Sequence, residues 1–139
     1  MAVQDWEVAE PACHAPHIGH VATLLADGAP HVVPIWLDAA GDELLLNTTE
    51  GSAKLRHLRR DPRVAVSIHA SSDPFLALTI LGTVVAEETG ERAAQHIDRL
   101  SIAYDAQPWA FAPGERERRV MLHIRPSRVI RMSEDGAEA

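Results

Sequence analysis

The chain of 139 residues has little cysteine, few aromatic side chains and a deficit of basic charge. Its one cysteine, Cys13, excludes an intrachain disulfide framework and a cysteine-based zinc site, and fits a reducing compartment. Thirteen basic residues against twenty acidic ones leave a net charge of −7, which argues against nucleic-acid binding. The apolar runs are far shorter than the ~20 residues of a membrane span. The N-terminal residues lack the basic start and apolar core of a secretory signal. We therefore expect a cytoplasmic protein with no membrane span.

The length fits one domain with a single core, and we find no repeat or linker. We expect this domain to span residues 1–132, with residues 1–17 as an N-terminal arm or short helix packed on the body. Residues 133–139 are small and acidic, which predicts a disordered tail.

Most of the domain carries the signals of antiparallel strands joined by tight turns. Asp-Gly at 27–28 is a hairpin turn, because glycine accepts a positive φ. Pro30 and Pro34 each remove a ladder donor, which predicts an edge strand or a bulge, and Gly82 predicts a bend or bulge. The expected strands cover residues 19–25, 30–37, 43–48, 63–70, 75–87, 119–124 and 128–132, with Pro126 as a corner between the last two.

Two helices interrupt the strands. Ser52 is a candidate N-cap of the first, which Asp61 and Pro62 end. Residues 91–104 have apolar positions at helical spacing. With a further helix in the arm, the fold class is mainly β: a Greek-key-like barrel of six or seven antiparallel strands with two or three short helices.

Residues 47–60 combine features that suit an anion. The hydroxyls of Thr48 and Ser52 and a helix start are followed by Lys54 in the first turn. A helix start offers free amides and the positive end of the dipole, and Lys54 adds a charge. The same segment fits a capped surface helix with a solvated basic face, and its glycine spacing is not that of a P-loop.

Histidine, cysteine and tryptophan supply the other candidates. His14, His17 and His20 are spaced by three, but an intervening proline and glycine argue against a metal site. Cys13 lies in the irregular arm and no serine sits in a nucleophile elbow, which disfavours covalent catalysis.

Tryptophans and one further histidine have two interpretations each. Trp36 and Trp109 suit either a core or the wall of a flat cofactor site. His31, on the second strand, suits a ligand or a solvent-facing position.

Several short motifs occur in a fixed order over residues 18–132. They include Gly19-His20-Val21-Ala22-Thr23-Leu24, Pro34-Ile35-Trp36, Asn47-Thr48-Thr49, Gly51-Ser52-Ala53-Lys54 and Gly82-Thr83-Val84. In this order they resemble the pyridoxamine 5'-phosphate oxidase-like, split β-barrel flavin-binding superfamily. More narrowly, the sequence is similar to the actinobacterial deazaflavin (coenzyme F420)-dependent reductases.

The resemblance implies a split-barrel homodimer with cofactor sites at the subunit interface. It places Ser52 and Lys54 at the cofactor phosphate, residues 34–36 along the ring, and Asn47 and Thr48 beside the cofactor. The candidate cofactor-binding residues are His31, Pro34, Ile35, Trp36, Asn47, Thr48, Ser52, Lys54 and His57.

The resemblance also implies a reaction in which reduced F420 gives a hydride to an electron-poor conjugated acceptor, such as a quinone or enone. The cofactor carries this chemistry, so no catalytic triad is required. Two alternatives stay open: an FMN-binding oxidoreductase of the same fold, and a non-catalytic flavin- or haem-binding protein. Ala53 stands where FMN-using oxidases often have arginine, and His57 where relatives frequently have asparagine. The features specific to vitamin B6 oxidation are not evident.

Overall fold

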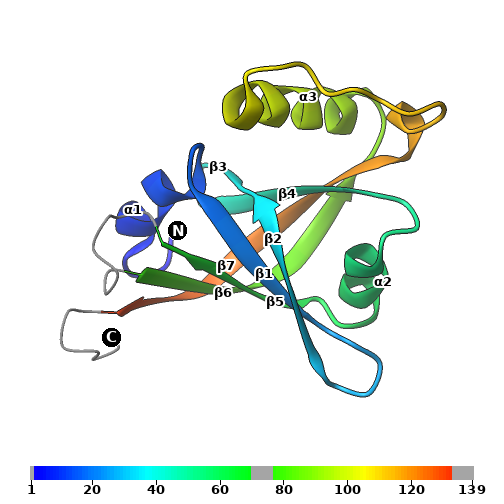
Figure 1. Cartoon of the computed structure of the whole chain (residues 1–139). Coiled ribbons are helices and arrows are strands. Elements are labelled where there is room, and N and C mark those ends of the chain that lie inside the picture. Colours follow the sequence, from blue (N-terminus) through cyan, green and yellow to red (C-terminus); the bar gives the residue numbers. More distant parts are fainter. Residues whose placement is uncertain (1, 70–76, 133–139) are drawn as a thin grey trace.

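The computed structural model describes residues 2–69 and 77–132 of the chain. Seven strands form one antiparallel sheet that curls into a half-barrel, in the order β2-β1-β5-β6-β7-β4-β3 (Figure 1). The strands are β1 (Ile18–Leu24), β2 (Pro30–Trp36), β3 (Asp38–Ala40), β4 (Glu43–Thr49), β5 (Arg63–Ile68), β6 (Ala77–Glu88) and β7 (Arg119–Met132). The predicted class, a mainly β split barrel, is confirmed.

Three α-helices and two 3₁₀ turns accompany the sheet within the described residues. They are α1 (Trp6–Ala9), η1 (Glu10–Cys13), α2 (Ala53–Arg60), α3 (Glu91–Asp105) and η2 (Arg116–Arg118). In the described part of the chain, none of these helices has the length and apolar character needed to cross a membrane.

Strand β4 is buried on both faces, because the core of the curl covers one face and α3 the other. Leu44 and Leu46 belong to the main core, whereas Leu45 packs in a smaller cluster with Ala93 of α3. Side chains alternate along a strand, so Asn47 shares the α3 face with Leu45. Figure 1 shows α3 lying outside the curl. The alternation therefore places Asn47 between the sheet and α3.

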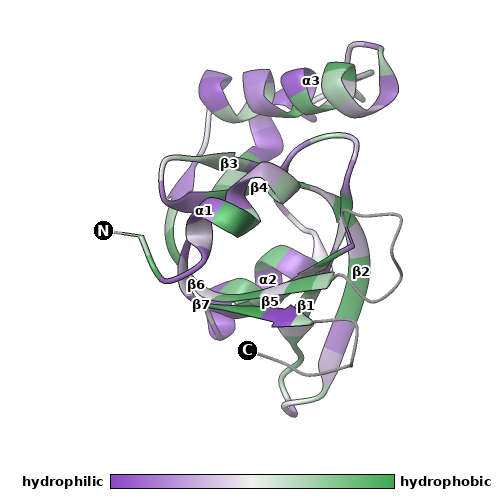
Figure 2. Cartoon of the chain, turned by 90° about the vertical axis from the view of Figure 1, so that its left-hand side faces the viewer, coloured by the Kyte–Doolittle hydropathy of each residue, from purple (hydrophilic) through white to green (hydrophobic). Residues whose placement is uncertain are grey.

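The cap predicted for α2 is confirmed. The Ser52 hydroxyl accepts a hydrogen bond from the Leu55 amide at 3.2 Å, and Asp61 is the C-cap residue. Leu55 and Leu58 turn into the main core. In the view of Figure 2, α2 lies within the ring that the strands form.

The N-terminal segment packs on the body through Trp6, which is 4% exposed. Its indole Nε1 donates to the Gly41 carbonyl at 2.9 Å. Gly41 lies in the turn between β3 and β4, so this contact ties the segment to the edge of the sheet.

The corner predicted at Pro126 is wrong, because β7 runs unbroken through it. Pro126 pairs with Gly82, Arg128 pairs with Leu81, and Ser127 between them is the extra residue of a bulge. A bulge accommodates a proline, which has no ladder donor. The irregularity predicted at Gly82 is confirmed by this shift in register.

Strand β3 was not predicted, since its three residues adjoin a turn and carry no strand periodicity of their own. The edge position predicted for the strand with two prolines is confirmed, because β2 ends the sheet. Residue 70, residues 75–76 of an expected strand and the expected tail at 133–139 lie outside the described residues.

Replacing Gly82 with alanine is expected to lower the free energy of unfolding by about 1–3 kcal/mol. A Cβ at this position would lie 2.8 Å from the backbone oxygen of Arg125, which cannot move without distorting β7. Gly19→Ala is the comparison, because its Cβ would meet the buried side chain of Leu37, which can move by rotation about its own bonds, rather than a backbone atom. Urea unfolding measures both, and an equal or smaller loss for Gly82→Ala would contradict the argument.

Candidate cofactor site

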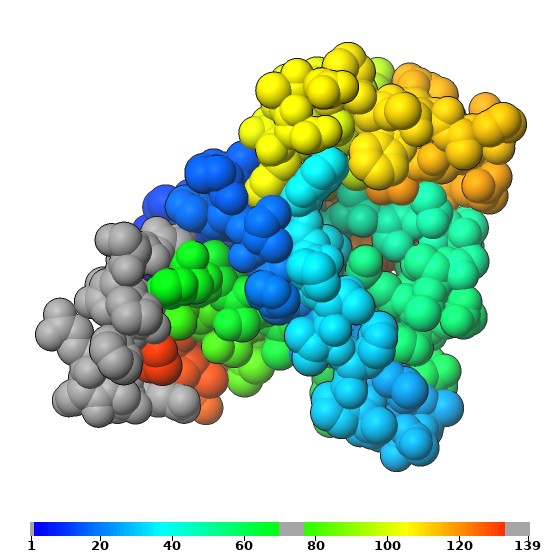
Figure 3. All heavy atoms as spheres, viewed as in Figure 1, coloured from blue at the N-terminus to red at the C-terminus, as the bar shows by residue number. Residues whose placement is uncertain are grey.

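A groove of about 320 Å³ opens between the end of β2 and α3. Its lining consists of Ile18, Pro34, Ile35, Trp36, Asn47, Ile97, Leu100 and Trp109. Figure 3 shows the surface hollowed where cyan β2 faces the yellow-to-orange α3 and the segment that follows it. Four predicted site residues, residues 34–36 and Asn47, thus meet in one groove.

Aromatic rings form one wall of this groove. The Trp36 ring stacks on Tyr104, with centroids 5.5 Å apart and planes at 8°, and meets the edge of Trp109 at 5.9 Å. The Tyr104 hydroxyl accepts from the Leu37 amide at 3.0 Å. Tyr104 and Trp109 therefore both contact the Trp36 ring. Trp36 lines the groove and is not part of the main core cluster.

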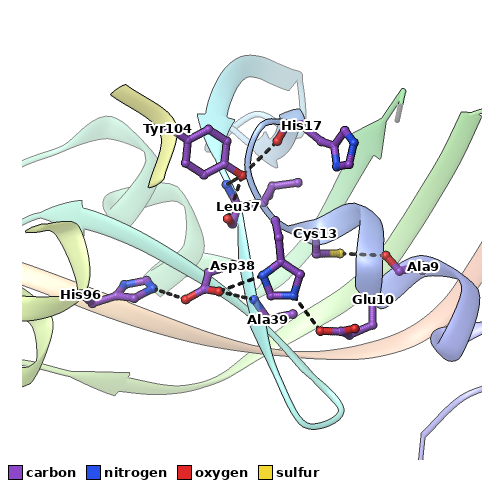
Figure 4. A network of polar contacts seen from close by, with 10 residues as sticks. Ala9, Glu10, Cys13, His17, Leu37, Asp38, Ala39, His96 and Tyr104 are labelled. Atoms are coloured by element: carbon purple, nitrogen blue, oxygen red, sulfur yellow. Dashed lines mark hydrogen bonds and ion pairs between the residues drawn. The ribbon is translucent and has the colours of Figure 1, made fainter. Parts of the chain in front are cut away.

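Asn47 provides the polar floor and is almost fully engaged. Its Nδ2 donates to the Ala93 carbonyl and to Nδ1 of His96, both at 2.9 Å, and its Oδ1 accepts from Arg119 Nε at 2.8 Å. On the far side, His96 Nε2 lies 2.9 Å from Asp38 Oδ2 (Figure 4). Buried hydrogen bonds of this kind fix the orientation of an amide.

Glu115 holds the segment after α3 in place. Its carboxylate accepts from Trp109 Nε1 at 2.6 Å, from the Ala112 amide at 3.0 Å and from Arg119 Nη1 at 3.2 Å. The guanidinium of Arg119 also lies 5.4 Å from the centroid of the Trp109 ring. Sequence reasoning missed Arg119 and Glu115. The partner of Arg119, Asn47, is remote in sequence, and no recognised motif marks the contacts of Glu115 with its near neighbours.

Lys54 lies half-buried at the start of α2 and makes no ion pair with any described residue. Burial lowers the pKa of its ammonium, and the positive charge of Arg119 lowers it further. Burial likewise lowers the pKa of Arg119, which Glu115 partly offsets. Two neighbouring cations that are both partly desolvated make a favourable place for an anion.

The hydroxyls predicted for the anion site meet beside Lys54. Thr48 Oγ1 and Ser52 Oγ are 2.7 Å apart. Ser52 already accepts the Leu55 amide, so the pair has one hydroxyl proton left to offer to a ligand.

His31 and His57 form a separate cluster on the inner side of the curl. His57 Nδ1 lies 2.9 Å from the Thr23 hydroxyl, and the two imidazoles meet edge to face at 5.5 Å. Burial lowers the pKa of His57, and the nearby charges of His31 and of two arginines of α2 lower it further. Neither ring lines the groove.

Cys13 and His14 of the arm both lie close to Glu10 and Asp38. Burial, with Glu10 and Asp38 nearby, raises the pKa of Cys13 to about 12, so the thiol is not a nucleophile at neutral pH. His14 lies between Glu10 at 2.7 Å and Asp38 at 3.3 Å. Over residues 2–69 and 77–132, no three side chains of metal-ligating type gather closely enough to hold an ion.

The sequence model of the pyridoxamine 5'-phosphate oxidase family matches residues 6–133, nearly the whole chain. The chain belongs to this family. The predicted superfamily resemblance is therefore confirmed. A search of curated proteins finds no match.

Several solved structures have a similar fold. A structure titled F420 Reductase superposes with a TM-score of 0.75 at 28% identity, over 86% of this chain and 94% of that one. A conserved hypothetical protein of Mycobacterium tuberculosis gives a TM-score of 0.67 at 22% identity, over 96% and 86% of the two chains. General Stress Protein 26 of Bacillus anthracis gives 0.71 at 16% identity, over 99% and 98%. The last two show the fold alone.

The pyridoxamine 5'-phosphate oxidase family consists mostly of flavin or F420 oxidoreductases. In this member the groove, its aromatic wall and the adjacent cations lie where β2, β4, α2 and α3 approach one another. This arrangement can hold a planar ring and an anionic group side by side.

The pH dependence of stability should reveal the charge of Glu115. Burial alone would raise its pKa, but the Ala112 and Trp109 hydrogen bonds and the charge of Arg119 lower it below the ordinary 4.5. Its ionised form therefore stabilises the fold above that value, and the contribution is lost as the pH falls through the lower folded pKa. We expect Glu115→Gln to be less stable than wild type at neutral pH, with the difference shrinking on acidification in urea unfolding. A difference that grows towards acid pH would show that the sign is wrong.

Proposed function

We propose that the protein is an F420-dependent reductase that acts on an electron-poor conjugated acceptor, such as a quinone or enone. The observation that carries this proposal is the 28% identity to the structure titled F420 Reductase, spread over 86% of this chain and 94% of that one. When bound, the reduced deazaflavin supplies the hydride.

The described residues fit such a coenzyme. A planar ring suits the apolar groove beside Trp36, with residues 34–35 along it and Asn47 beneath. A phosphate suits Lys54, which has no carboxylate of its own among the described residues, together with the hydroxyls of Thr48 and Ser52. His31 and His57 would support α2 from inside the curl rather than touch the ring.

The chain itself would act by binding and orientation. Cys13 is buried and protonated, and the polar groups at the groove floor are engaged with one another. Holding two reactants at ~3–3.5 Å in a fixed orientation is by itself a large source of acceleration. The half-buried groove also limits the access of water to the reacting atoms.

An FMN-dependent oxidoreductase is the second candidate. Lys54 is a point charge and does not distinguish one phosphate from another, so the phosphate site suits FMN as well. A haem- or flavin-binding protein without turnover is the third interpretation. Parallel titrations with F420 and FMN separate the first two.

The reductase proposal predicts direct transfer of a label. With a coenzyme that carries deuterium at its donor carbon, we expect a carbon-bound deuterium in the reduced enone by mass spectrometry, since a label on a hydroquinone oxygen would exchange with water. Cys13→Ala should keep turnover within a few-fold, since the thiol lies buried away from the groove. An enone reduced without the label, or a reaction that requires Cys13, would overturn the mechanism.

Lys54→Ala is expected to weaken coenzyme binding by about 1.5–3 kcal/mol, the range for hydrogen bonds to charged groups. Ser52→Ala should cost less, because its hydroxyl is partly used in capping α2. Arg60→Ala is the matched control, since it removes an exposed positive charge from the same helix. Equal effects of Lys54→Ala and Arg60→Ala in isothermal titration would show that only net charge matters.

We further propose that two copies of the chain form a homodimer with cofactor sites at their interface. In support, β1, β5 and β6 carry a second groove of about 420 Å³ on their outer side, where Ala22, Ala65 and Leu81 lie. Val32 on neighbouring β2 is 58% exposed. Burial against a second copy would remove this apolar surface from water.

Light scattering at micromolar concentration should therefore give the mass of a dimer. Leu81→Glu should shift the protein to monomer, because a charge in the apolar groove opposes its burial. Ile102→Glu is the control, since Ile102 is 51% exposed on α3, away from that groove. A monomeric wild type would refute the dimer.

A further inference from the structure

The orientation of the Asn47 amide follows from its partners. Arg119 Nε can only donate, so the atom 2.8 Å from it must be the amide oxygen. The amide nitrogen then faces α3, where the Ala93 carbonyl receives one of its protons. Its second proton points at His96 Nδ1 at 2.9 Å.

The same contacts fix the protonation of His96. Its Nδ1 must accept from Asn47 and so carries no proton, and the proton of the neutral ring is on Nε2. That nitrogen lies 2.9 Å from Asp38 Oδ2, which accepts the proton in a hydrogen bond (Figure 4). The imidazole is fully buried, so these two partners are its polar environment within the described residues.

Asp38 is itself held in place. Its Oδ1 accepts from the amide of Ala39 at 2.9 Å and lies 3.3 Å from His14 Nδ1. His14 in turn contacts Glu10. A continuous series of polar contacts thus runs from the N-terminal segment to the groove floor.

We propose that Asp38 and His96 are positioning residues of the groove: their hydrogen bond selects the Nε2–H tautomer of His96, whose Nδ1 then accepts the second amide proton of Asn47 and reinforces the amide orientation that holds Arg119. For cofactor binding, this inference rests on the proposed function. The opposite tautomer would place a proton of His96 against a proton of Asn47 and favour a turned amide. A turned amide would present a donor to Arg119, whose guanidinium also contacts Glu115 and Trp109.

The hydrogen bonds of Asn47 limit what its amide can offer to a ligand. Both amide protons are used, and one lone pair of Oδ1 is taken by Arg119. Asn47 therefore faces the groove only as an acceptor, so a ligand group that binds there must bring an N–H or O–H.

The first test uses nuclear magnetic resonance on the protein without ligand. Long-range ¹H–¹⁵N correlations of the histidine rings should show His96 with a proton on Nε2 and none on Nδ1 at neutral pH. The Arg119 Nε–H signal should exchange slowly with water in wild type and several-fold faster in Asp38→Ala, because without an acceptor at position 38 His96 no longer holds the amide that binds Arg119. The reverse tautomer in wild type, or unchanged exchange in Asp38→Ala, would overturn the proposal.

His123→Gln is the matched control. His123 also lies between two carboxylates, with Glu43 at 2.9 Å and Glu88 at 2.8 Å, but it is outside the groove and the Asn47 contacts. We expect it to leave Arg119 exchange unchanged even where thermal stability falls. Equal changes in both variants would reduce Asp38 to a general stabilising role and refute the proposal.

A coenzyme-binding measurement tests whether the Asp38–His96 pair affects the groove. Asp38→Ala should weaken F420 or FMN binding about tenfold, the factor that corresponds to one well-made hydrogen bond, with His123→Gln close to wild type. If wild type binds neither coenzyme, the proposed function fails, and the resonance measurements alone then decide the positioning role.

Discussion

The buried amide of Asn47 connects α3 to the sheet, and the groove exists because of that connection. Its two donors reach α3 at Ala93 and His96, while its oxygen accepts from Arg119 of β7. Tyr104, near the other end of α3, bonds the backbone of Leu37 between β2 and β3 (Figure 4). The helix is thus pinned at both ends by directional polar contacts, whereas apolar packing alone would let it slide. One wall of the groove is α3, so its shape depends on these bonds.

The charge beside the groove is positive, opposite in sign to the net charge of the protein. The chain carries a net charge of −7, yet half-buried Lys54 and buried Arg119 lie close together beside the groove. Among the described carboxylates, Glu115 contacts Arg119 and also accepts a hydrogen bond from Trp109. A site that attracts an anion in an acidic protein needs such a local arrangement, because long-range attraction would oppose binding.

Much of the fold could be predicted from local sequence. The Ser52 cap, the turn at Gly28 and the edge strand with its two prolines act over a few residues, and each was predicted correctly. The corner at Pro126 was wrong because the alternative to a break, a bulge at Ser127, depends on the opposite strand. No neighbour in sequence reveals that Gly82 leaves room there for the backbone of Arg125.

The sequence by itself determined most of the strands, the capped helix and the family, because periodicity, turn chemistry and ordered motifs are read along the chain. It also pointed to residues 34–36 and Asn47, which the fold brings into one groove. Only the tertiary structure decided that His31 and His57 lie inside the curl, and that Arg119 stands beside Lys54. The physical reason is that burial and charge proximity are set by the curl of the sheet, which joins residues tens of positions apart.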